Sequence, residues 1–161
     1  MEKLADARDV GSNMLEDILP RSIDNTYRGQ KVALWVFGLL VLMRSVIGIN
    51  SIVNGAAVMS TADGIALNTY PAAAAQNLVA IWALLGLSNL FMGALGVLVL
   101  IRYRGMVPLM FGLLLLSHLG GRLISQFHPI VRSGAPPASI INLTLLALIV
   151  VGFALSLWRR R

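Results

Sequence analysis

Four long apolar stretches constrain the fold of this chain more than any other feature. They run over about residues 32–53, 78–101, 106–127 and 140–158. A helix needs about 20 apolar residues to cross the roughly 30 Å hydrocarbon core of a bilayer, and helices satisfy their own backbone groups there. We therefore predict an all-α fold, in which residues 28–161 form a four-helix transmembrane bundle.

The composition agrees with a location in a membrane. Hydrophobic residues make up 57% of the chain and charged residues 12%, whereas about a quarter of the residues in soluble domains are charged. The mean hydropathy is +0.79. There is no cysteine, which excludes disulfides, thiolate metal sites and cysteine nucleophiles.

Basic residues at the ends of the apolar stretches predict the orientation of the bundle. They are Arg28, Lys31, Arg102, Arg104, Arg159, Arg160 and Arg161. The other two connections contain only Arg132. Because Lys and Arg accumulate in cytoplasmic segments, we expect both termini to be cytoplasmic in a multi-pass protein of a bacterial plasma (inner) membrane. The basic residues form no continuous face, so we expect no nucleic-acid partner.

Residues 1–27 form a separate, acidic segment before the first span. Apolar residues recur in this segment at helical spacing up to Pro20. This spacing predicts a short cytoplasmic amphipathic helix that ends before the proline. Its acidity argues against binding to anionic lipid, which is favoured by Lys and Arg. Two interpretations stay open: the helix folds under the bundle, or it docks a protein partner.

Polar side chains within the spans mark the candidate site. Arg44 shares a helical stripe with Ser51, and His118 shares one with Arg122 and Ser125. No Asp or Glu follows Asp63, so the intramembrane arginines have no obvious acidic partner. Charged residues at membrane depth are costly and indicate function by default. The candidates for binding a ligand or partner are Arg44, Ser51, Asn54, Asn89, His118, Arg122 and Ser125.

The two intramembrane arginines are not equivalent. Arg122 is near enough to the outer surface to reach water, whereas Arg44 facing lipid would cost about 2.5–3.5 kcal/mol. We therefore expect Arg44 to face the bundle interior or a wet crevice. Its acceptors could be backbone carbonyls, Asn side chains, water or Asp63, which makes it structural, or they could come from a ligand, a lipid headgroup or a partner subunit.

Most catalytic chemistries lack the groups they need. His118 and His128 would lie about 15 Å apart on one helix, so they cannot clamp a haem between them. There are too few ligands for zinc, and a serine nucleophile would lack its orienting acid. We expect no catalytic residue, no metal and no obligate cofactor, and lipid or quinone binding stays open.

Small residues at four-residue spacing predict close helix contacts. Such pairs are Ser51 with Gly55, Ser117 with Gly121, and Gly152 with Ser156. The spacing does not separate contacts inside the bundle from contacts with a membrane-protein partner or a second copy.

The segment from Gly120 to Ser125, with its Gly-Arg-x-x-Ser pattern, is followed by a Pro- and Gly-containing loop and a last span that ends in arginines. In this layout residues 31–161 resemble small bacterial four-span proteins of the DoxX-like and related domain-of-unknown-function families. The second span departs from that pattern, because residues 80–86 lack the Glu and the Tyr-Gly-Gly-like segment. The resemblance implies a link to quinone chemistry.

Two functions follow as expectations. The first is a non-enzymatic accessory or interaction subunit of a bacterial membrane complex, since catalytic groups are missing and Arg44 lacks a partner. The alternative is a protein that binds a lipid, a quinone or an anion in an outward-facing pocket around Arg44, His118 and Arg122.

Overall fold

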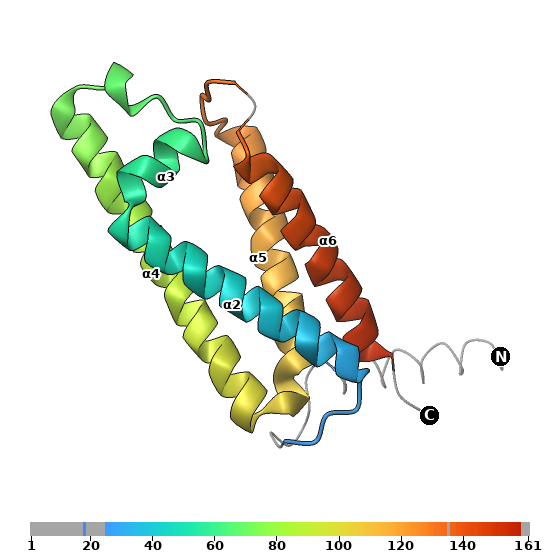
Figure 1. Cartoon of the computed structure of the whole chain (residues 1–161). Helices are drawn as coiled ribbons and strands as arrows, with labels where there is room; N and C mark the ends of the chain where they lie inside the picture. The colour runs from blue at the N-terminus through green and yellow to red at the C-terminus, as the bar shows by residue number, and fades with distance from the viewer. Residues whose placement is uncertain (1–17, 19–24, 135, 159–161) are drawn as a thin grey trace.

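The computed structural model describes residues 18, 25–134 and 136–158 (Figure 1). Four long helices run through it, and each is long and apolar enough to cross a membrane. They are α2 (Lys31–Val53), α4 (Ala72–Arg102), α5 (Val107–Phe127) and α6 (Ala138–Leu157). The described residues contain no strand, so the predicted all-α four-helix bundle is confirmed. The amphipathic helix predicted over residues 1–27 falls largely outside the described residues.

The ends of the helices follow from proline positions and short connections. Helix α4 starts at Ala72, before the apolar span that begins at about residue 78, because Pro71 provides a preset backbone angle just before its first turn. A 3-10 turn, η2 (Arg104–Met106), joins α4 to α5. The connection from α2 to α4 contains α3 (Gly55–Thr61) and the 3-10 turn η1 (Leu67–Thr69).

Helices α2 and α4 form the most extensive helix contact, and glycines make it close. A Cβ atom on Gly48 would lie 2.7 Å from the carbonyl oxygen of Gly86, and one on Gly86 would lie 2.8 Å from that of Gly48. Further along, Gly93 faces Ser45 and Gly96 faces Val41. Backbone thus packs directly on backbone, as small residues permit within membranes.

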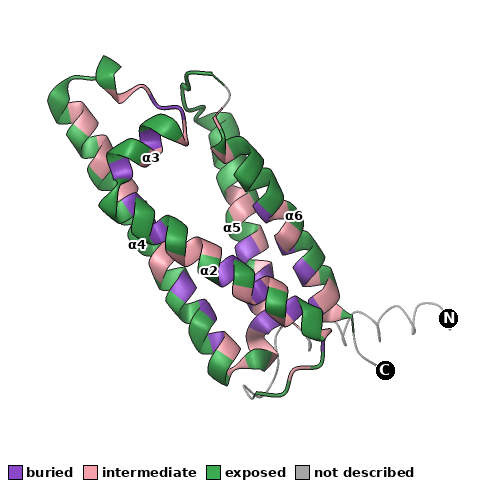
Figure 2. Cartoon of the chain, in the orientation of Figure 1, coloured by how far each residue is buried: buried purple, intermediate pink, exposed green. Residues whose placement is uncertain are grey.

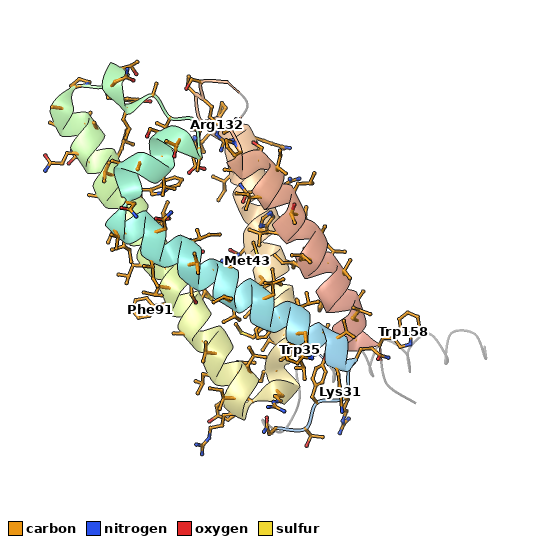
Figure 3. All side chains as sticks on the ribbon, viewed as in Figure 1. Lys31, Trp35, Met43, Phe91, Arg132 and Trp158 are labelled. Atoms are coloured by element: carbon orange, nitrogen blue, oxygen red, sulfur yellow. The ribbon has the colours of Figure 1, made fainter. Side chains whose placement is uncertain are left out.

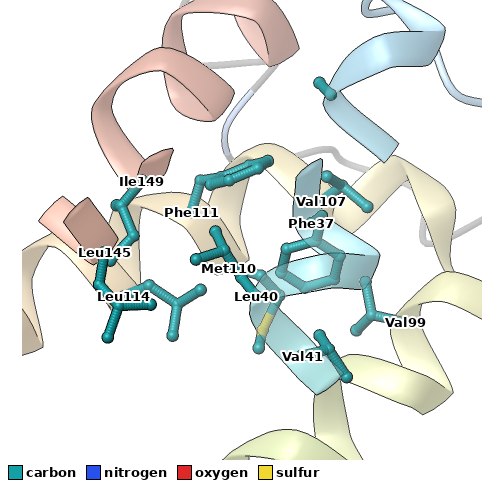
Figure 4. Close-up of a cluster of buried hydrophobic side chains, with 11 residues drawn as sticks. Phe37, Leu40, Val41, Val99, Val107, Met110, Phe111, Leu114, Leu145 and Ile149 are labelled. Atoms are coloured by element: carbon teal, nitrogen blue, oxygen red, sulfur yellow. The ribbon is translucent and has the colours of Figure 1, made fainter. Parts of the chain in front are cut away.

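The apolar core lies at one end of the bundle, which we call the core end; it carries Lys31, Arg102–Met106 and Trp158. Figure 4 shows its buried side chains, contributed mainly by α2, α5 and α6. The rings of Phe37 and Phe111 lie 5.3 Å apart between centroids and tilted by 59°. In Figure 2 the buried residues of α5 and α6 gather toward this end.

Toward the opposite end, the α2–α4 pair and the α5–α6 pair diverge (Figure 1). Their connections meet again through hydrogen bonds, so we call this the bridged end. The Ser133 backbone N–H donates to the Gly64 carbonyl at 2.7 Å, and the Ser133 hydroxyl donates to the same oxygen at 3.0 Å. The Ala138 N–H donates to the Ala62 carbonyl at 3.1 Å. Gly64 has a φ of +70°, which a glycine adopts without strain.

Candidate functional site

A cavity of about 580 Å³ lies between the apolar core and the bridged end. It begins at Arg44, less than one helical turn beyond the core residue Val41, and reaches Arg132 in the α5–α6 connection. Its walls come from all four long helices and that connection. The lining residues are Arg44, Asn89, Ser117, His118, Gly121, Arg122, Ser125, Gln126, Arg132, Ser139 and Asn142.

Arg44 is half-buried on α2 and hydrogen-bonds across to α4. Its Nη1 donates to Oδ1 of Asn89 at 3.0 Å. The amide of Asn89 is itself oriented, because its Nδ2 donates to the Leu85 carbonyl at 3.2 Å. A guanidinium has five N–H donors, and this is the only hydrogen bond that the Arg44 side chain makes with the described residues. Most of its donors are therefore open to a ligand or water.

His118 and Arg122 enter the cavity from α5. The imidazole of His118 lies near enough to Arg44 and Arg122 to be affected by their charges, and it lies close to the backbone of Asn142 on α6. Arg122 lies one turn further along α5 and is exposed. The expected stripe on the third span thus faces the same space as Arg44 from the first.

Small residues keep the α5 wall of the cavity open. A Cβ atom on Gly121 would meet nothing within 4 Å, and the Ser125 hydroxyl donates to the Gly121 carbonyl at 2.9 Å. The Ser117/Gly121 spacing therefore forms no close helix contact within the described residues. The Ser51/Gly55 spacing does, since Ser51 packs on Gly86 and Gly55 packs on Val79.

The charged side chains that line the cavity are all positive. Arg44, Arg122 and Arg132 line it, and no Asp or Glu is among its lining residues in the described part of the chain. Asp63 lies outside the cavity, after the end of α3, and the charge of Arg132 acts on it. Burial raises the pKa of Asp63 above its ordinary 3.8, and Arg132 offsets part of that rise.

The raised pKa of Asp63 gives a prediction for stability against pH. Because the folded-state value exceeds the unfolded one, the folded chain holds this proton more tightly, and ionised Asp63 destabilises the fold. Asp63→Asn should therefore raise the unfolding temperature at pH 7, with the gain shrinking as the pH falls toward 3.8. Thermal unfolding in detergent across this pH range measures the gain. A variant less stable than the wild type at pH 7 would mean that attraction to Arg132 outweighs the cost of burial.

Two of the predicted site residues lie elsewhere. Ser51 is only 5% exposed and is packed against α4. Asn54 is exposed at the α2–α3 junction, where its Nδ2 donates to Oδ1 of Asn50 at 2.8 Å. The other predicted residues, Arg44, Asn89, His118, Arg122 and Ser125, line one cavity. Gln126, Arg132 and Ser139 also line this cavity. Apart from their polarity, nothing in the sequence indicated that they belong to the site.

The cavity offers three guanidinium groups together with neutral amide and hydroxyl side chains that can donate or accept hydrogen bonds. Within the described residues, no group of three His, Cys, Asp or Glu could hold a metal ion. Comparison with family models, curated proteins and solved structures finds no match. The resemblance to DoxX-like proteins stays a prediction, and the site rests on its own geometry.

Proposed function

We propose that this chain binds the anionic headgroup of a membrane amphiphile in the cavity beside Arg44. One observation carries the proposal: Arg44, Arg122 and Arg132 surround one space of about 580 Å³ whose described lining contains no carboxylate. Arg44 is the half-buried member of the three, and a cation at membrane depth without a counter-charge is costly. An anion that accepts hydrogen bonds from the free guanidinium donors would remove that cost.

An amphiphile fits this location better than a free anion. The cavity lies between apolar helices whose outer faces carry exposed large side chains, such as Leu116 and Leu123 on α5. Among the described residues, the core between this cavity and the core end is filled by apolar side chains. A ligand with a polar head and an apolar tail would match the polar cavity and the apolar surface around it.

The proposed role is binding rather than catalysis. The Ser125 hydroxyl donates to the Gly121 carbonyl, and His118 lies close to the Asn142 backbone. The described lining offers no carboxylate that could orient a base. From the basic flanks we also propose that the core end faces the cytoplasm, which would open the cavity in the outer half of a bacterial plasma membrane.

The proposal is tested by titrating the detergent-purified protein with lipids and counting the bound molecules by native mass spectrometry. We expect acidic lipid, such as phosphatidic acid or phosphatidylglycerol, to be retained, and the combination of Arg122→Gln with Arg132→Gln to weaken the retention of one bound molecule. Phosphatidylcholine should be retained much less. Equal retention of acidic and zwitterionic lipid, or capture of a neutral quinone instead, would contradict the anionic headgroup.

An accessory role in a larger complex is the second proposal. Its support is the exposed apolar surface of all four long helices. The small residues give it little support, because Gly48, Gly86, Gly96 and Gly152 are already packed against this chain's own helices. A strict monomer in mild detergent that never co-purifies with a partner would contradict it.

A further inference from the structure

A second cavity, of about 640 Å³, lies at the core end, far along the bundle from the one beside Arg44. Its basic lining residues are Arg28, Lys31 and Arg104, and Asn25 and Leu34 also line it. They come from two parts of the chain: the segment before and at the start of α2, and the turn between α4 and α5. The fold brings these distant residues around one space.

Both sides of this cavity are fixed by hydrogen bonds. The Arg104 backbone N–H donates to Oδ1 of Asn25 at 3.4 Å, and the Gln30 N–H donates to the Leu155 carbonyl on α6 at 3.2 Å. Between them, Gly29 is buried so closely on the Ser156 carbonyl that a Cβ atom would clash. The segment carrying Arg28 and Lys31 is thus anchored to α6 and to the α4–α5 turn.

The basic side chains that line this cavity have N–H donors that the described residues do not use. Nε of Arg104 donates to the Leu100 carbonyl at 2.9 Å, which orients the guanidinium, and its terminal nitrogens make no hydrogen bond with the described residues. The side chains of Arg28 and Lys31 are exposed and make no hydrogen bond within the described residues. No Asp or Glu is among the described residues that line the cavity.

We propose that this cavity binds the phosphate of an acidic lipid in the leaflet at the core end. Basic clusters next to membrane spans attract anionic headgroups, and an oriented guanidinium suits phosphate oxygens. Leu34 supplies an apolar wall. Trp35, 81% exposed, lies one turn from Lys31 on the outer face of α2 (Figure 3), and tryptophans favour the headgroup level of a bilayer. A lipid held here would have its acyl chains near that indole.

The fluorescence of Trp35 can report lipid binding at this cavity separately from lipid binding at the cavity beside Arg44. In a background with Trp82→Phe and Trp158→Phe it is the sole tryptophan, and lipids brominated on their acyl chains quench its fluorescence on contact. Reconstituted vesicles would contain brominated phosphatidic acid or brominated phosphatidylcholine in trace amounts. We expect phosphatidic acid to quench with an apparent affinity about fivefold higher or more. The triple variant Arg28→Gln, Lys31→Gln, Arg104→Gln should reduce this preference to near one.

Arg102→Gln is the matched control, because Arg102 lies at the same end but does not line the cavity; it should keep the preference. Inorganic phosphate at matched ionic strength should also leave the preference unchanged, and its loss there would assign the site to soluble phosphate and overturn the lipid source. Equal quenching by both lipids in the protein that keeps Arg28, Lys31 and Arg104 would overturn the proposal. The proposal would also be overturned if Arg102→Gln and the triple variant lost the preference for phosphatidic acid to the same extent.

Discussion

A leucine in place of Gly86 should prevent α2 from packing on α4 and give the largest loss of stability of any substitution proposed for this chain. Even its Cβ atom would lie 2.8 Å from the Gly48 carbonyl oxygen and 2.8 Å from Cβ of Ser51. These are backbone and near-backbone atoms, so no side chain can rotate away. Overpacking typically costs about 1–3 kcal/mol and occasionally more, and here two helix axes would have to separate. Unfolding by SDS in mixed micelles, followed by far-UV circular dichroism, measures the effect.

Gly120→Leu is the control for that experiment. Gly120 lies within α5, and a Cβ atom there would meet nothing within 4 Å. The same change of residue type should therefore leave the unfolding midpoint close to that of the wild type. If Gly86→Leu unfolds at the same SDS fraction as Gly120→Leu, the close α2–α4 contact does not exist in the membrane protein.

Replacing Arg44 by leucine should give the largest loss of ligand binding. Arg44 is the innermost charge of the cavity, and only one of its donors is used within the described residues, by Asn89. A hydrogen bond to a charged group contributes about 1.5–3 kcal/mol, which corresponds to a roughly tenfold to hundredfold loss of affinity for the acidic lipid. Lipid titration by native mass spectrometry compares the two proteins. Arg44→Lys keeps the positive charge but loses the planar guanidinium with its parallel N–H donors. Its affinity for the acidic lipid should lie between those of Arg44→Leu and the wild type.

Two further variants separate binding from folding. Asn89→Leu removes the acceptor that holds Arg44 but keeps the charge, so its effect on affinity should be smaller than that of Arg44→Leu. Arg102→Leu, at the core end and outside the cavity, should leave the affinity unchanged. Unchanged lipid affinity in Arg44→Leu, together with a large drop in stability, would make Arg44 a structural arginine.

The spans could be predicted from the sequence because length and hydropathy alone determine whether a helix crosses a bilayer. The stripe of His118, Arg122 and Ser125 was predictable for a similar reason, since residues three to four apart share a helix face. The same rule placed Ser51 with Arg44, yet Ser51 packs on Gly86. Which part of a stripe meets a neighbouring helix depends on where the two helices cross, and that is a property of the pair.

A pocket around Arg44, His118 and Arg122 was among the expectations, but the extent and the full lining of the cavity were not predictable from patterns along the chain. It exists because the two helix pairs diverge beyond Val41 and are rejoined at Gly64 and Ser133, and nothing local in the sequence reports that divergence. The pairs Ser51/Gly55 and Ser117/Gly121 look alike in the sequence, but one packs against a helix and the other lines open space. Arg132 joins the site through the path of a connection, which helical periodicity does not describe.

The most direct test of the central claim is a density map of the protein purified from membranes in its native lipid, at a resolution that shows side chains. The account predicts an elongated density in the cavity, with its polar head within hydrogen-bonding distance of the Arg44 guanidinium and its tail along the apolar helix faces. A cavity closed by protein side chains, or an Arg44 whose donors are all satisfied by the chain's own carbonyls, would contradict it.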